Sequence, residues 1–85
     1  MRYMETIART PHQLGNSIRE RRRRLGLSQE QVALKVGVRQ KTISDIETSG
    51  TARLDTLLRV LGVLDLEFVV RMRTKASSKD IEEIF

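Results

Sequence analysis

The spacing of hydrophobic residues along this chain changes once, near residue 65. Between residues 10 and 64 the apolar positions recur every three or four residues, which predicts a series of short amphipathic helices. Apolar and polar positions largely alternate in residues 66–73, which is typical of a β-strand. We therefore expect an N-terminal arm, a helical domain, a strand and a flexible polar tail, covering residues 1–9, 10–64, 65–73 and 74–85.

The limits of the first helix are predicted by residues that cap helices. Thr10 has a side chain suited to the N-cap, and Pro11 is favoured at the first helical position. The helix is expected to continue to about Arg24 and to stop at Gly26, which can adopt the left-handed conformation that ends a helix.

Two further helices follow with a short turn between them. Ser28 is a suitable N-cap with Gln31 at the return position, and Gly37 ends this second helix. The third helix begins at Arg39 or Gln40 and ends near residue 48. Hydrophobic residues can hold the two helices in a fixed corner and leave the polar face of the third helix exposed. These hydrophobic residues are Val32, Val36, Val38, Ile43 and Ile46.

A leucine-rich fourth helix is expected at about residues 54–61, with Gly62 at its end. Its leucines are spaced so that four of them share one side of the helix. These are Leu54, Leu57, Leu58 and Leu61.

The strand at residues 65–73 raises the question of its partner, because a single strand cannot satisfy its own backbone hydrogen-bonding groups. A second copy of the chain can supply the same strand, which predicts a two-fold dimer joined by an antiparallel two-stranded ribbon. The alternative is pairing with arm residues 4–8. The alternating side chains that would form the dimer strand are Leu66, Phe68, Val70 and Met72.

Composition narrows the classes of function. The 85 residues carry a formal net charge of +5, and residues 1–73 hold 14 Lys and Arg against 8 Asp and Glu. A basic body favours a polyanionic partner. The chain has no cysteine and one histidine, His12, so we expect no disulfide, no metal site and no cofactor. It shows no apolar signal core and no set of convergent catalytic groups, which predicts a cytoplasmic protein that is not an enzyme.

The pattern from Leu25 to Glu47 resembles the helix-turn-helix domain of the lambda repressor/Cro (XRE) family, and the similarity extends over residues 12–64. More narrowly, the chain is similar to HipB-type antitoxins in its length, its Pro-x-Gln-Leu helix start at residues 11–14, its segment Arg39–Ser44 and its single late strand. The resemblance implies an all-α lambda-repressor-like domain of four to five short helices plus the ribbon strand. It also implies a repressor of its own operon that binds and restrains a HipA-type kinase toxin.

Candidate DNA-contacting residues lie at the beginning of the second and third helices. Gln40 suits a bidentate contact to adenine, Arg39 and Lys41 suit guanine or a phosphate, and Ser44 can reach a base edge or phosphate. The family places Gln40, Lys41 and Ser44 in base-reading positions. Ser28 and Gln29, at an N-terminus that favours anions, are candidates for backbone contacts. Polar residues are also common on any exposed helix face.

The run Arg19–Arg24 contains five arginines that point around most of a helix, so most of them should form a solvated face. The resemblance implies a different role for Arg22, which would form a structural ion pair with Glu47. Asp45 would repel phosphate on the side facing DNA unless it accepts from cytosine or orients Lys41.

The tail combines acidic residues with three apolar ones, which are Ile81, Ile84 and Phe85. Two interpretations are open: the tail is an anchor for the toxin, or it is a disordered, protease-sensitive end. Two other functions remain open. One is a stand-alone repressor without a toxin, and the other is an interaction adaptor that uses the corner to bind protein and has little affinity for DNA.

Overall fold

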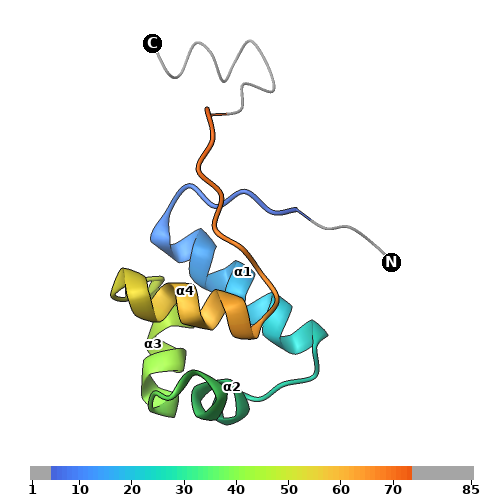
Figure 1. The fold of residues 1–85 in the computed structure, drawn as a ribbon, viewed down its shortest axis with the longest axis vertical. Helices are drawn as coiled ribbons and strands as arrows, with labels where there is room; N and C mark the ends of the chain where they lie inside the picture. The colour runs from blue at the N-terminus through green and yellow to red at the C-terminus, as the bar shows by residue number, and fades with distance from the viewer. Residues whose placement is uncertain (1–4, 74–85) are drawn as a thin grey trace.

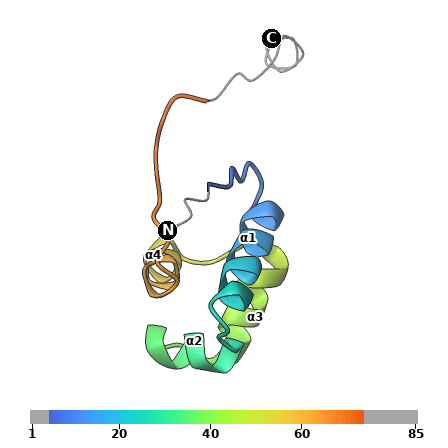
Figure 2. The same ribbon diagram turned by 90° about the vertical axis from the view of Figure 1, so that its right-hand side faces the viewer.

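A computed structural model of the chain describes residues 5–73, and this part folds into four helices. They are α1 (Pro11–Arg24), α2 (Gln29–Val36), α3 (Gln40–Ser49) and α4 (Leu54–Val63). α3 packs against both α1 and α2, and α2 also contacts α4 (Figure 1). Figure 2 shows α1 and α3 side by side, with α2 across one end. The predicted all-helical fold of this part of the chain is confirmed. The tail residues Ile81, Ile84 and Phe85 lie outside the described residues.

The helix starts are the predicted ones because local hydrogen bonds define them. Thr10 Oγ1 accepts from the backbone N–H of Gln13 at 3.1 Å, with Pro11 at the first position. Ser28 and Gln31 form a reciprocal capping box, in which Ser28 Oγ accepts from the Gln31 N–H at 3.0 Å and Gln31 Oε1 accepts from the Ser28 N–H at 2.8 Å. These bonds satisfy N–H groups that have no partner inside the helix.

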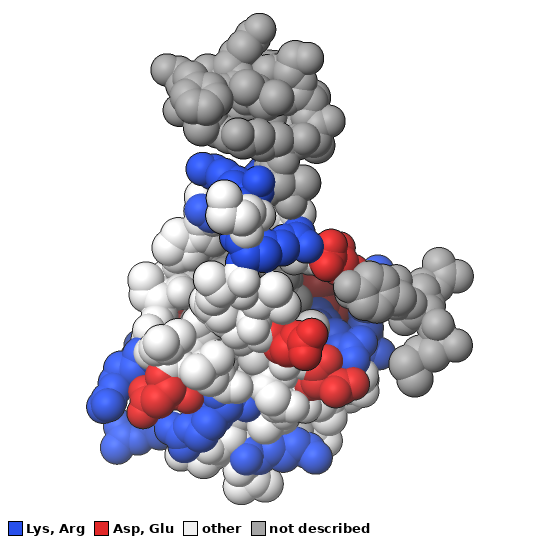
Figure 3. Space-filling model, turned by 45° about the horizontal axis from the view of Figure 1, so that its top comes forward, with Lys and Arg blue, Asp and Glu red and all other residues white. Residues whose placement is uncertain are grey.

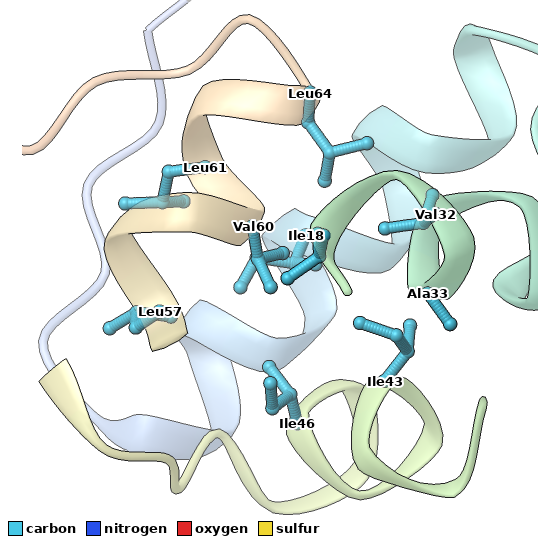
Figure 4. Packing of buried hydrophobic residues seen from close by; sticks show 10 residues of the cluster. Ile18, Val32, Ala33, Ile43, Ile46, Leu57, Val60, Leu61 and Leu64 are labelled. Atoms are coloured by element: carbon cyan, nitrogen blue, oxygen red, sulfur yellow. The ribbon is translucent and has the colours of Figure 1, made fainter. Parts of the chain in front are cut away.

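Side chains from all four helices meet in one small core (Figure 4). Each helix contributes residues on the stripe that faces its neighbours, as the three-to-four-residue spacing predicts. The members that are completely or almost completely buried are Ile18, Val32, Ala33, Val36, Ile43, Ile46, Leu57, Val60, Leu61 and Leu64.

The four leucines predicted to share one side of α4 are not equally buried, and the predicted end of α4 at Gly62 was wrong. Leu54 and Leu58 are 61% and 45% exposed, whereas Val60 and Leu64 are fully buried. The buried stripe is therefore rotated around the helix relative to the row of four leucines. α4 also continues through Gly62 to Val63, because Leu64 still donates its N–H to carbonyls of the last turn.

A glycine in α1 brings that helix close to α3. A Cβ on Gly15 would lie 2.6 Å from the carbonyl oxygens of both Ile46 and Glu47. Only a residue without a side chain permits this approach. The contact places the following turns of α1 against the C-terminal half of α3, where Glu47 is buried.

Residues 66–73 leave α4 and run away from the helices without regular secondary structure (Figure 2). They lie beside the arm, since Arg71 Nη1 is 3.5 Å from Glu5 Oε2. A shallow hollow of about 370 Å³ separates Ile7–Arg9 from Phe68–Arg73. No β-ladder joins the two segments within the part of the chain that the structure describes. The strand and its pairing therefore stay predictions.

Candidate nucleic-acid interface

α2 and α3 form a rigid corner with a tight turn between them. Gly37 adopts a left-handed conformation at φ 87°, and its N–H and that of Val38 both bond to the carbonyl of Ala33. Ile43 and Ile46 then anchor α3 in the core with no exposed surface. Because these contacts use one face of α3, its other face is free to meet a partner.

The polar residues predicted to contact DNA lie at this corner. Arg39, Gln40 and Lys41 are exposed at the start of α3, and Ser44, one turn later, is half-buried. Arg39 occupies the N-cap position but makes no capping hydrogen bond through its side chain. Lys41 Nζ lies 3.2 Å from Asp45 Oδ2, an exposed pair one turn apart that holds the lysine along the helix.

A buried ion pair joins α1 to α3 beneath this surface. Arg22 Nε and Nη2 donate to the two carboxylate oxygens of Glu47 at 2.6 and 3.0 Å. Arg22 Nη1 donates to the carbonyl of Leu27 at 2.9 Å. Glu47 has no exposed surface, so the pair is a fixed structural element that supports α3 from below.

The same carboxylate holds two more side chains, which sequence reasoning did not connect to it. Gln29 Nε2 and Arg19 Nε donate to Glu47 Oε1 at 3.1 and 3.4 Å. Gln29 Oε1 in turn accepts from Gln40 Nε2 at 3.4 Å. A continuous polar path therefore leads from the buried pair to the exposed start of α3. The spacing of Arg19 and Arg22 by three residues, which places them on one helix face, was the available signal.

The electrostatic balance at Glu47 favours its ionised form. Burial by itself raises the pKa of Glu47, but hydrogen bonds from Arg22, Gln29 and Arg19 and the charge of Arg22 outweigh it and lower the pKa below its ordinary value of 4.5. The carboxylate is therefore charged at neutral pH, and each of its buried oxygens has a donor.

The remaining polar positions stabilise the scaffold. Ser28 Oγ accepts the capping bond and the Ser28 N–H donates to Gln31, which leaves the hydroxyl hydrogen of Ser28 able to donate to a ligand. His12 is exposed, as predicted, and its Nδ1 lies 3.2 Å from the carbonyl of Thr48, which ties the start of α1 to the end of α3. Among residues 5–73 no three His, Cys, Asp or Glu side chains come together as metal ligands, and no helix there is long and apolar enough to cross a membrane.

Charged side chains are distributed unevenly over the surface. Figure 3 shows several separate groups of Lys and Arg on the face in view, with Asp and Glu between some of them. The face in view therefore carries no single continuous basic patch.

A capped helix, a tight glycine turn and a second helix with an exposed polar start define the class of helix-turn-helix proteins. A family model described as "Helix-turn-helix" matches residues 18–70. Antitoxin HipB of Escherichia coli (strain K12) is 31% identical over 75 residues, which cover 87% of this chain and 85% of that protein. The chain belongs to the helix-turn-helix family and, within it, to the family of the HipB antitoxins.

Solved structures of HipB assemblies have the same fold. The structure of a HipA-HipB-O2-O3 complex contains a chain that is 29% identical with a TM-score of 0.73, and the match covers 84% of this chain and 100% of that one. A HipB-O4 20mer complex is also 29% identical, with a TM-score of 0.70 and coverage of 87% and 100%.

Proposed function

We propose that this protein is a sequence-specific DNA-binding repressor that serves as the antitoxin of a type II toxin-antitoxin pair. It autoregulates its operon and binds a HipA-type kinase toxin. Membership of the HipB antitoxin family supports the proposal. The two related structures also support it, one being of a HipA-HipB-O2-O3 complex and the other of a HipB-O4 20mer complex.

The main observation in favour of DNA recognition is that the start of α3 is exposed while hydrogen bonds connect it to the buried ion pair. Gln40 is exposed, yet its amide is connected through Gln29 to the buried carboxylate of Glu47. A side chain that is oriented before binding loses less entropy when it meets a base. Gln40 can then make a bidentate contact to adenine, which contributes about 1–3 kcal/mol of discrimination.

The neighbouring residues complete the proposed contacts. Arg39 and Lys41 reach guanine acceptors or phosphates, and Ser44 a base edge or phosphate. At the first turn of α2, Ser28 and Gln29 present a helix N-terminus to a phosphate, with the dipole favouring the negative charge. The phosphate contacts determine register and the base contacts determine sequence.

Residues 65–73 would join two copies into a dimer. Phe68, Val70 and Met72 are 54%, 87% and 91% exposed in the single chain, which leaves an apolar row that a second copy can cover. Pairing the two segments as an antiparallel ribbon satisfies their backbone groups. The two α3 helices would then read the two halves of a palindromic operator.

Replacing Gln40 with alanine is expected to relax specificity at one base pair of each half-site while the fold is retained. Operators would be selected in vitro from a random duplex library with the wild-type protein and with Q40A, and the enriched sequences compared. Asn16→Ala, which removes an exposed amide from α1, is the matched control and should leave the selected sequence unchanged. Equal loss of affinity for every duplex would contradict base reading by Gln40.

Replacing Phe68 and Val70 together with glutamate is expected to convert the dimer into monomers, because like charges would face each other across the ribbon. Sedimentation equilibrium measures the mass, and operator affinity should fall with it. Val69→Glu places one charge on the other side of the strand and should leave most of the dimer intact. A wild-type protein that is already monomeric would rule out the ribbon.

The alternatives make different predictions for a pull-down from the native host with sequencing of bound DNA. A stoichiometric kinase-like protein together with a promoter-proximal palindrome supports the antitoxin. The palindrome alone would indicate a stand-alone repressor. A protein partner with no DNA and no salt-dependent binding to duplexes would indicate an adaptor.

A further inference from the structure

Two positively charged side chains lie against the single buried carboxylate of Glu47. Glu47 carries one negative charge and lies against two guanidinium groups, those of Arg19 and Arg22. The lowered pKa keeps Glu47 ionised, so the cluster retains a net charge of one positive unit at neutral pH. An uncompensated positive charge next to a buried group is costly unless an anion or water reaches it.

The two arginines differ in how completely their donors are used. Arg22 donates through Nε and Nη2 to Glu47 and through Nη1 to a backbone carbonyl, and its side chain is 11% exposed. Arg19 donates only through Nε, at a long distance of 3.4 Å, and its side chain is 36% exposed. Within residues 5–73 no acceptor meets Nη1 or Nη2 of Arg19. The surplus charge is therefore available at Arg19.

The position of Arg19 relative to the corner is fixed by a shared atom. Its Nε and the Nε2 of Gln29 donate to the same oxygen of Glu47. Arg19 therefore lies beside the first residue of α2, although it comes from α1. Gln29 also contacts Gln40, so the Arg19 guanidinium borders the surface that begins α2 and α3.

We propose that Arg19 is a further DNA-binding residue, which uses its free Nη1 and Nη2 groups to hold a backbone phosphate next to the start of α2. The inference rests on the proposed DNA-binding function and adds a contact from α1 to it. Glu47 orients the guanidinium through Nε and leaves its outer edge open, and a planar guanidinium can donate two hydrogen bonds from that edge to phosphate oxygens.

A phosphate contact predicts a particular dependence on salt. Each phosphate that a cationic side chain neutralises contributes about −0.9 to the slope of log K against log salt concentration. Arg19→Gln should therefore reduce the magnitude of the slope by about one for each protomer on the duplex. Affinity should fall by about tenfold at low salt, to the same extent for all sequences, because a phosphate carries no base information.

The experiment measures binding by fluorescence anisotropy at several salt concentrations with two duplexes of roughly three helical turns. One is obtained by in vitro selection with the wild-type protein and the other is its scrambled sequence. Arg24→Gln is the matched control, because it removes the same charge from an exposed position of α1 that is about 140° around the helix from Arg19. Arg19→Lys keeps the charge but not the planar fork, so it should retain most of the slope and lose affinity.

The outcomes separate the inference from the function on which it rests. A reduced slope in R19Q, with unchanged slope in R24Q, supports the phosphate contact. An unchanged slope in R19Q, with or without a lower melting temperature, would show that Arg19 only holds Glu47, and would overturn the inference. An equal reduction of the slope in R19Q and R24Q would mean that the effect comes from the overall charge of the protein, and this result would also overturn the inference. No binding of either duplex by the wild-type protein would refute the proposed function itself.

Discussion

Replacing Glu47 with glutamine is expected to destabilise the domain by roughly 3–5 kcal/mol, the cost of removing one partner of a buried ion pair. Glutamine keeps the shape of the side chain, but it leaves Arg22 with its charge buried and uncompensated. Its amide group also presents donors where Arg19 and Gln29 now donate. Chemical denaturation followed by circular dichroism would measure the loss as a lower midpoint.

Asp45→Asn is the matched control for Glu47→Gln, since it neutralises a carboxylate of the same helix. Asp45 is exposed and its pair with Lys41 lies in solvent, so the expected change is within about 0.5 kcal/mol. A similar midpoint for E47Q and D45N would mean that the network around Glu47 adds nothing to stability.

The same pair makes the fold sensitive to acid in a defined direction. Because the pKa of Glu47 is lower in the folded protein than its ordinary value of 4.5, its contribution to stability is complete above that value. The contribution is lost as the pH falls below 4.5 and through the lowered pKa of the folded state. The difference in midpoint between the wild-type protein and E47Q should therefore narrow in acid. A constant difference at lower pH would contradict the assigned pKa.

Replacing Gly50 with alanine is expected to have an effect of similar size, about 3 kcal/mol or more. Gly50 ends α3 at φ 72°, a conformation that residues with a side chain rarely adopt. In addition, a Cβ at this position would overlap the backbone carbonyl of Pro11 at the start of α1. Since backbone atoms cannot rotate aside, α1 and α3 would have to separate, which would also strain the pair of Arg22 and Glu47.

Gly26→Ala isolates the backbone part of this effect. Gly26 has nearly the same φ, 71°, but no atom other than those of its two chain neighbours lies within 4 Å of the position of its Cβ. The expected cost there is only the left-handed strain, about 1–2 kcal/mol. Thermal unfolding of G26A and G50A gives the comparison. Equal melting temperatures would mean that the contact between Gly50 and Pro11 relaxes without cost.

The limits of the first three helices could be predicted closely because local interactions define them. Thr10 and Ser28 bond to N–H groups three residues away, and Gly37 needs only its own backbone conformation to stop α2. Such bonds form between neighbours in the chain and do not depend on how the helices pack. The exposure of Gln40 and Lys41 at the start of α3 could be predicted for the same reason, since a capped helix, a turn and a second helix follow in direct succession.

The core face of α4 depends on its neighbours. Apolar residues surround much of this helix, so several stripes with the correct spacing exist, and the spacing alone does not select one. Packing against α2 selects the stripe with Val60 and Leu64 and leaves Leu54 and Leu58 exposed. The end of α4 differs for a related reason: a glycine permits a helix to stop without requiring it.

By itself, the sequence determined the helical domain, its corner and the residues exposed there, because helix caps and hydrophobic spacing act over a few residues. Tertiary structure alone decided which side chains meet across the chain. It brought Arg19 and Gln29 to the carboxylate of Glu47, beside the expected partner Arg22, and it allowed backbone contact at Gly15 and Gly50. These contacts join positions 18 to 39 residues apart, and their geometry follows from the angle and distance at which α1 and α2 pack on α3.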